Sequence, residues 1–155
     1  MKKRLAAIAL CAFAALPALP ASAAPKPGIV YGGHTKQGAQ VWIRLRPDRR
    51  SIASLHLDWL ASRSQCTNDR PIVMPEDLGA ENGFPTLKIR HGRFSQTVSE
   101  RAGADDGSGQ ERFTIAGTVS DAKIAGTFSA SVTIDVTGGG SYTCTLPRTS
   151  FSAVN

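Results

Sequence analysis

The sequence has few of the residues from which protein metal centres are usually built. It contains three histidines and three cysteines among 155 residues. His34, His56 and His91 are far apart, with no pair at the i, i+4 spacing that places two ligands on one helix face. Neither Cys66 nor Cys144 has a Cys or His partner at zinc-ligand spacing. We therefore expect no metal site and no cofactor.

Helical periodicity and long apolar runs are also missing from most of the chain. No stretch repeats its apolar residues every three to four positions, and only residues 75–80 suggest a single helical turn. Beyond residue 23, no apolar run approaches the roughly 20 residues that a membrane-spanning helix requires. The sequence thus disfavours a helical fold and predicts a protein that does not span a membrane.

The N-terminal 23 residues have the pattern of a secretory signal peptide. A charged segment at 1–4 precedes an apolar segment at 5–16, and Ala-Ser-Ala at 21–23 fits a cleavage site. We predict that residues 24–155 form one exported β domain, located in the periplasm or outside the cell. Loss of the three cations in the first segment would lower the formal net charge from +6 to +3.

The clearest pattern in the chain lies at residues 111–134. Apolar and polar residues alternate on either side of a polar tetrad at 120–123, which predicts an antiparallel hairpin with one buried face. If Val119 faces Ile124, every apolar side chain falls on the same face and Gly117 opposes Gly126. A pair of opposed glycines leaves a gap on the buried face.

We expect the indole of Trp59 to fill the gap above these two glycines. Its strand, residues 51–61, alternates in the same way, and Leu55 and Leu57 lie on the same apolar face of the strand as Trp59. Residues 40–46 form a further alternating strand. The intervening patterns are weaker: we expect a long loop at 62–85 and a flexible loop at 101–110. His91-Gly92 has the composition of a two-residue hairpin turn.

Cys66 and Cys144 remain after removal of the signal segment, which contains the third cysteine. An even pair of cysteines in an exported protein predicts a disulfide. The last hairpin turns at 138–140, and a register that sets Ile134 opposite Cys144 places this cysteine on the buried face.

The one cluster of chemically distinctive residues is basic. The alternation of residues 40–46 places Trp42, Arg44 and Arg46 on the outward face, and Arg49 and Arg50 follow in the turn. Arginines beside an indole suit a polyanion or a stacked sugar. These five residues are our candidate ligand-binding site, with an anionic envelope polymer or a glycan as its partner. A charged, solvated surface without a ligand is the alternative.

Catalytic motifs are not apparent. The glycines of residues 33–38 have the spacing of a phosphate-binding loop, but no Lys-Ser/Thr pair follows them. A glycosidase needs two carboxylates about 5–9 Å apart in a cleft. Asp58, Glu100, Glu111 and Asp135 lie among polar residues, and we expect all four to be solvated. We therefore assign no catalytic residue and expect no nucleic-acid partner.

Several short segments resemble a pattern that recurs in small exported bacterial proteins rich in β-strands. The segments are Tyr31-x-Gly-x-Thr-x-Gln-Gly38, Cys66, Ile89-x-x-Gly-Arg-Phe-Ser95, Phe113-x-Ile-x-Gly117, Ile124-x-Gly-Thr-Phe128, Tyr142-x-Cys144 and Phe151-x-Ala153. The resemblance supports the disulfide and the order of the strands. It implies no particular activity.

Together these patterns predict an all-β protein, an antiparallel β-sandwich or partly closed barrel of about seven to nine strands with one disulfide. The function we expect is that of an exported, non-enzymatic binding or interaction module. The alternative is a secreted, glycosidase-like hydrolase whose carboxylates are brought together only by the fold.

Overall fold

The protein is described by a computed structural model that covers residues 28–105 and 107–155. The predicted signal peptide, residues 1–23, lies outside the described residues. Within them the chain forms nine strands and two short 3₁₀ helices. In chain order the elements are β1 (Val30–Thr35), β2 (Gln40–Leu45), β3 (Ser51–Ala61), η1 (Arg63–Gln65), β4 (Ile72–Leu78), η2 (Ala80–Asn82), β5 (Leu87–Lys88), β6 (Arg93–Ala104), β7 (Gly107–Val119), β8 (Lys123–Val136) and β9 (Ser141–Val154).

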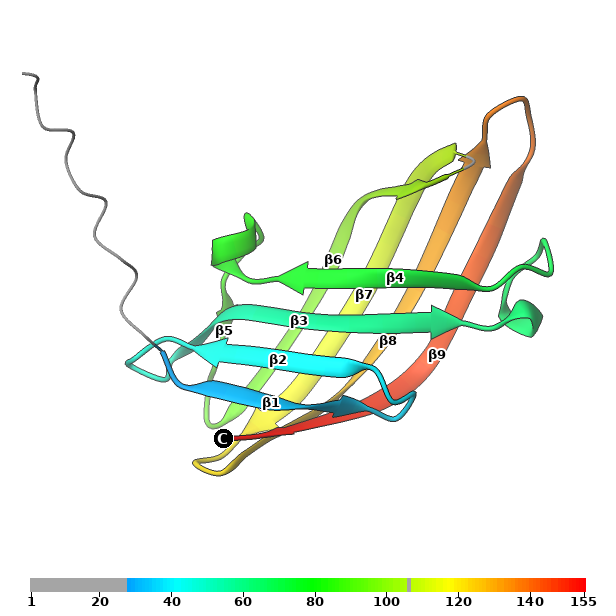
Figure 1. The fold of residues 1–155 in the computed structure, drawn as a ribbon. Helices are drawn as coiled ribbons and strands as arrows, with labels where there is room; N and C mark the ends of the chain where they lie inside the picture. The colour runs from blue at the N-terminus through cyan, green and yellow to red at the C-terminus, as the bar shows by residue number, and fades with distance from the viewer. Residues whose placement is uncertain (1–27, 106) are drawn as a thin grey trace, which may run out of the picture.

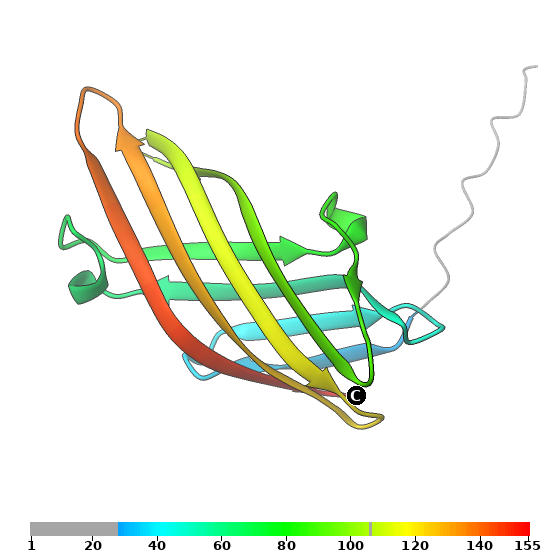
Figure 2. The same cartoon turned by 180° about the vertical axis from the view of Figure 1, so that it is seen from behind.

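All nine strands belong to one antiparallel sheet, which confirms the predicted all-β class in its partly closed barrel form. The sheet order is β4-β3-β2-β1-β9-β8-β7-β6, and β5 pairs with β3. Figures 1 and 2 show the sheet curled over itself, so that β1–β4 cross the long strands β6–β9. No helix in the described part of the chain has the length and apolar character needed to cross a membrane.

The inner face of the curled sheet contains the core. The alternation predicted for residues 40–46 and 51–61 is observed: Val41, Ile43 and Leu45 are buried, as are Leu55 and Leu57. The inward residues of β7 and β8 belong to the same core cluster, and in it the ring centroids of Phe113 and Phe128 are 5.8 Å apart. Each layer therefore covers the apolar face of the other.

The central hairpin has the predicted register. Val119 pairs with Ile124, Gly117 with Gly126, and Ile115 with Phe128. The expectation that Trp59 fills the gap at the glycines is wrong. A Cβ atom built on Gly117 would lie 2.6 Å from Cζ of Phe94, and one built on Gly126 would lie 2.6 Å from Cζ of Phe151.

The register explains this difference. Phe94 in β6 pairs with Gly117, and Phe151 in β9 pairs with Gly126. Each phenyl ring therefore lies over the glycine of the strand beside it, within the same layer. Aromatic packing over a strand glycine restores contact area that the glycine lacks. Trp59 comes from the opposite layer and contacts other residues, described below.

The packing of Phe151 over Gly126 leads to a prediction for the variant Gly126→Val. The new side chain collides with the carbonyl oxygen of Ala116 and with Phe151, and we expect overpacking to lower the free energy of unfolding by about 1–3 kcal/mol. Urea denaturation should show that adding Phe151→Leu recovers part of this loss, because the two side chains compete for one space. Thr127→Val, at the next position on the outer face, is the control and should change stability by less than about 0.5 kcal/mol. Equal recovery by Trp59→Phe would contradict the packing.

Two predicted loops contain regular structure. Residues 62–85 include the strand β4, whose residues Met74, Glu76 and Leu78 point inward. Pro75, expected to begin a helical turn, lies in this strand instead, at the edge of the sheet where proline is tolerated. Residues 101–110 are also largely paired, since the β6–β7 hairpin continues to the pair Ala104–Gly107. Small and charged residues in these strands obscured the alternation.

The last hairpin differs from its predicted register by two residues. Ile134 pairs with Tyr142, and Val132 pairs with Cys144. A shift of two residues keeps every side chain on its face, so Cys144 is buried as expected. The predicted disulfide between Cys66 and Cys144 is present, with 4.0 Å between the Cα atoms.

The disulfide attaches the segment between β3 and β4 to β9. Thr67 N donates to Thr143 O at 3.0 Å, and Thr143 N donates to Thr67 Oγ1 at 2.9 Å. The bridged cysteines are 78 residues apart in the sequence, a separation for which the chain-entropy model gives about 4–5 kcal/mol of stabilisation.

We predict that the double variant Cys66→Ala/Cys144→Ala folds with a free energy of unfolding about 2–5 kcal/mol below that of the wild type. Urea denaturation of both proteins without reductant measures the difference. A wild-type protein treated with reductant should shift toward the variant, while the variant itself should not respond. A difference below 1 kcal/mol would show that the hydrogen bonds of Thr67 alone hold this segment.

Candidate functional site

The outer face of β1–β4 carries the exposed tryptophan of the predicted site. Trp42 lies in β2 between Gly32 of β1 and His56 of β3, and 51% of its surface is exposed. A Cβ atom at Gly32 would lie 2.9 Å from Cζ3 of Trp42. The glycine thus allows the indole to lie close against the backbone of β1, where one ring face is supported by the sheet.

Two hollows adjoin the indole. One, of about 550 Å³, is lined by Trp42 together with His34, Gln40 and Ser152. The other, of about 360 Å³, lies toward β3 and β4 and is lined by Trp42 with Arg44, Ser54, His56, Asp77, Glu81 and Asn82. Both contain hydrogen-bonding groups beside an aromatic surface, which is the composition of small-ligand sites.

Charged groups in the second hollow are paired with one another. Arg44 forms an ion pair with Glu81 of η2. His56 Nδ1 lies 2.8 Å from Asp77 Oδ1 and its Nε2 lies 3.7 Å from Asp58 Oδ1. Asp58 faces outward, as predicted from the sequence. These contacts orient the polar groups beside Trp42 and leave the hollow without an excess of positive charge.

The predicted arginines do not all line one hollow. Arg44 lines the hollow beside Trp42, whereas Arg46, Arg49 and Arg50 lie in the β2–β3 turn and line neither hollow. Arg49 has structural partners: its guanidinium is 2.8 Å from Asp121 Oδ1 and donates to the hydroxyl of buried Tyr31. Arg46 and Arg50 are exposed, and within the described ranges neither forms an ion pair.

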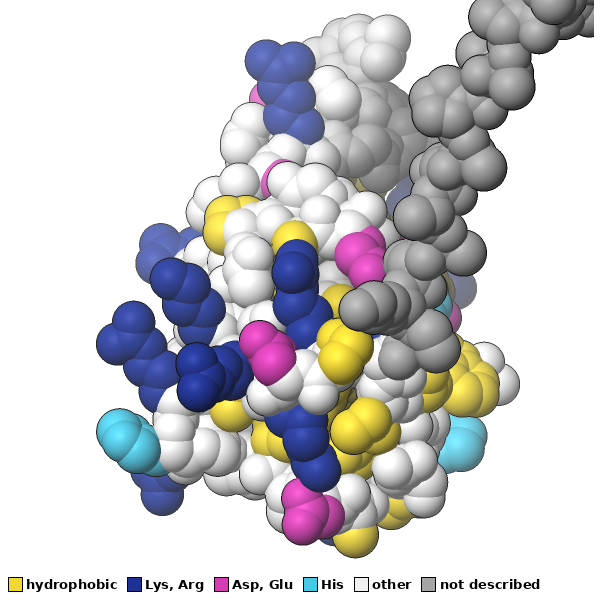
Figure 3. Space-filling model, turned by 90° about the vertical axis from the view of Figure 1, so that its left-hand side faces the viewer, with side chains coloured by type: hydrophobic (Ala, Val, Ile, Leu, Met, Phe, Trp, Pro, Cys, Tyr) yellow, Lys and Arg dark blue, Asp and Glu magenta, His cyan; other side chains and the backbone are white. Residues whose placement is uncertain are grey.

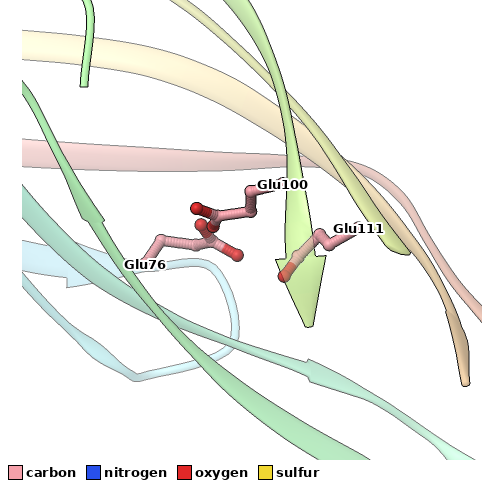
Figure 4. A group of neighbouring side chains, drawn as sticks. All are labelled: Glu76, Glu100 and Glu111. Atoms are coloured by element: carbon pink, nitrogen blue, oxygen red, sulfur yellow. The ribbon is translucent and has the colours of Figure 1, made fainter. Parts of the chain in front are cut away.

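A second cluster, which sequence reasoning missed, lies inside the curled sheet. Glu76 of β4, Glu100 of β6 and Glu111 of β7 point toward one another (Figure 4). One carboxylate oxygen from each lies within 4.8 Å of the others. Glu76 and Glu111 are 1% and 3% exposed, so the expectation that Glu111 is solvated is wrong. Glu100 is half-buried, so it too departs from the expected surface position.

The pairing of the strands explains the position of these glutamates. Glu111 lies two residues before Phe113 and therefore has the inward phase of β7. Glu100 pairs with Glu111, and Glu76 pairs with Leu57. A glutamate is rarely buried unless it has partners, and for this reason the sequence favours a solvated position for Glu111. Phase alone could have identified Glu111.

Trp59 supplies the hydrogen bonds to this cluster. Its indole Nε1 donates to Glu76 Oε1 at 2.9 Å and to Glu111 Oε1 at 3.2 Å. Burial, followed by the hydrogen bond and charge of Glu111, raises the pKa of Glu76 from 4.5 to about 9. Burial also raises the pKa of Glu111 and of Glu100. At neutral pH Glu76 therefore retains its proton.

This arrangement does not favour the hydrolase alternative. A glycosidase places its carboxylates about 5–9 Å apart in a cleft that admits a sugar, whereas the oxygens of Glu76 and Glu111 lie within 4.8 Å of each other and both residues are sealed from solvent. Three oxygens within 4.8 Å could also surround a cation, but the indole N–H of Trp59 already donates to both Glu76 and Glu111.

Comparison of the chain with family models, with curated proteins and with solved structures finds no match. The function must therefore be argued from the geometry.

The raised pKa of buried Glu76 leads to a prediction about how the stability of the protein depends on pH. Between the ordinary carboxyl pKa of 4.5 and about 9, the unfolded chain releases the proton of Glu76 while the folded protein retains it. The stability contributed by the neutral acid is thus complete below pH 4.5 and is lost as the pH rises toward 9. Glu76→Gln keeps a neutral side chain at every pH, and its free energy of unfolding should fall less between pH 5 and 9.

Urea denaturation at pH 5, 7 and 9 measures this difference, with Asp135→Asn on the exposed surface as the matched loss of one carboxylate. The control should follow the wild type. A Glu76→Gln profile that also follows the wild type would show that Glu76 is already ionised in the folded protein.

Proposed function

We propose that this protein is an exported, non-enzymatic domain that binds a saccharide on the outer face of β1–β4. The observation that carries this proposal is the exposed indole of Trp42, which is supported by the backbone at Gly32 and has a polar hollow on each side. The apolar C–H face of a sugar ring packs on such an indole, while its hydroxyls reach toward the hollows.

The polar groups around Trp42 match the hydroxyls of a sugar. Gln40 and Ser152 offer donors and acceptors in one hollow, and His56, Asp77 and Asn82 offer them in the other. Four of these groups lie on strands and Asn82 lies in the short helix η2, and a rigid scaffold positions binding residues more precisely than a loop. Because a hollow lies on each side of the ring, the site offers contacts to more than one sugar unit of a chain.

The charge of the site favours a neutral saccharide over a polyanion. Asp77 and Glu81 line the same hollow as Arg44, and Glu81 neutralises that arginine. A polyanion would have to displace this ion pair and approach two carboxylates. A neutral chain encounters no such repulsion.

Two further features support export. The first 23 residues have the pattern of a signal peptide, and the disulfide between Cys66 and Cys144 is a bond that persists in oxidising compartments. Both are consistent with a protein that meets polysaccharide outside the cytoplasm.

We predict that Trp42→Ala raises the dissociation constant for the bound saccharide at least tenfold, because the stacking surface is lost. A panel of soluble neutral polysaccharides, tested by affinity electrophoresis and then by calorimetry, identifies the ligand and measures the change. Val73→Ala removes another exposed apolar side chain, on β4, and should bind as the wild type does.

Fluorescence provides an independent measurement, because the chain has two tryptophans and Trp59 is fully buried. Saccharide should protect the fluorescence of the wild type from quenching by acrylamide. In Trp42→Phe the fluorescence comes only from Trp59, and saccharide should leave its quenching unchanged. If no neutral polysaccharide binds, or if Trp42→Ala binds as well as Val73→Ala, the proposal is wrong.

A further inference from the structure

A separate hollow of about 950 Å³ lies at the end of the molecule where β5 passes the first residues of β6. Its lining includes Ala116 and Gly117 of β7 with Ala125 and Gly126 of β8. The alanines point outward, since their neighbours in the strands point into the core. The small side chains of these two alanines leave a shallow depression in the outer surface of the sheet.

Three cations lie around this floor. Lys88 comes from β5, and Arg90 and Arg93 flank the turn into β6. The turn is the tight one predicted from the sequence: His91 and Gly92 have φ values of 49° and 67°, as a two-residue type I′ turn requires. Arg90 N donates to Arg93 O at 2.8 Å, and Arg93 N donates to Arg90 O at 2.9 Å. The two arginines are therefore fixed directly opposite each other.

This pairing of like charges has an energetic cost. Like charges directly opposite on neighbouring strands are destabilising, and an acidic partner usually relieves the repulsion. No Asp or Glu lines this hollow among the described residues. Nor does Lys88, Arg90 or Arg93 form an ion pair within them. The positive charge is thus uncompensated within the described part of the protein and available to an external anion.

The fold adds one cation, Arg50, from a distant part of the sequence. Ser51 pairs with Lys88, and Ile89 N donates to Arg50 O at 2.8 Å. The exposed arginine of the β2–β3 turn therefore lies beside the strand that borders the hollow. Figure 3 looks at this end of the molecule and shows Lys and Arg side chains gathered on it.

We propose that the hollow bordered by Lys88, Arg90 and Arg93 is a second binding site, which takes the carboxylate or sulfate groups of an anionic polysaccharide. The guanidinium groups offer paired donors to such oxyanions, and hydroxyls of Thr118 and Thr127 line the floor between the cations. This site is independent of Trp42, which lies on the other layer of the sheet.

The lining favours a polysaccharide over the other polyanions of cells. Single-stranded nucleic acids bind where bases stack on exposed aromatic rings, but Phe94, which lines the hollow, is 4% exposed. Insertion into a membrane surface needs exposed apolar side chains. The large exposed hydrophobic residues of the described chain, Val30, Trp42, Leu60, Val73 and Val154, all lie outside this hollow.

The test measures binding of the full domain to heparin and to polygalacturonate, as sulfated and carboxylated probes. Arg90→Gln/Arg93→Gln should raise the dissociation constant at least tenfold at low salt and reduce its dependence on salt concentration. Arg101→Gln/Arg112→Gln removes the same charge from exposed positions outside the hollow and should change binding less than threefold.

A third variant, Ala125→Gln, fills the floor of the hollow without changing any charge. It should weaken binding at least fivefold, and thermal denaturation should show that it remains folded. Trp42→Ala should bind both probes as the wild type does, so that failure of the saccharide proposal leaves this one intact.

Equal losses in the two double-arginine variants would show diffuse attraction to net charge and overturn the site. Unchanged binding by Ala125→Gln, in a protein that is folded, would also overturn it. Tighter binding to single-stranded DNA or to vesicles with anionic lipid than to either polysaccharide would assign the surface to a different partner.

Discussion

One sheet supplies both layers of this protein, so its inner face can be buried only against itself. The sheet has to bend sharply between β1 and β9, where Gly33 pairs with Ala153. A Cβ atom at Gly33 would overlap the carbonyl oxygen of Ser152, which makes glycine necessary for this close approach. An irregularity in the β8–β9 pairing near Phe128 adds twist to the same region. The bend brings β3 and β4 across β6 and β7, and the core follows from it.

The bend leaves two sheet edges, β4 and β6, whose inward residues meet in the interior. Trp59 and the Glu76–Glu111 pair join the layers there through polar contacts. Two adjacent buried carboxylates would repel each other if both were ionised, and one of them therefore keeps a proton. Glu76 Oε2 is buried and has no hydrogen-bond partner within the described residues. The cluster is thus a specific but costly contact, in contrast to the close aliphatic packing around it.

The sequence permitted the hairpin of residues 111–134 to be predicted because a single alignment places all of its apolar residues on one face. The strands from 40–46 and 51–61 were predicted for the same reason. The interior polar contacts could not be predicted in this way. Alternation identifies which residues point inward, but it does not say which layer a side chain meets. The prediction that Trp59 points inward is confirmed. The prediction that it packs on Gly117 and Gly126 is wrong, because Phe94 and Phe151 reach these glycines from neighbouring strands of the same layer.

Prediction of the charged surface was limited for the same reason: a pattern along the chain does not show which distant residues meet. Charge spacing along the chain identified the arginines at 44–50 as one basic cluster, yet their compensation depends on residues far away in the sequence. Glu81 neutralises Arg44 and Asp121 pairs with Arg49, so that the outer face around Trp42 carries little net charge.

The uncompensated cations come together elsewhere. The pairing of β5 with β3 places Lys88 beside Ser51, next to Arg50, and the turn at His91-Gly92 sets Arg90 against Arg93. Whether a group of cations forms a positive surface therefore depends on the fold, because the fold determines which cations lie beside an acidic residue. Counting charges along the sequence finds the candidates, and only the pairing of strands shows which of them remain free to bind.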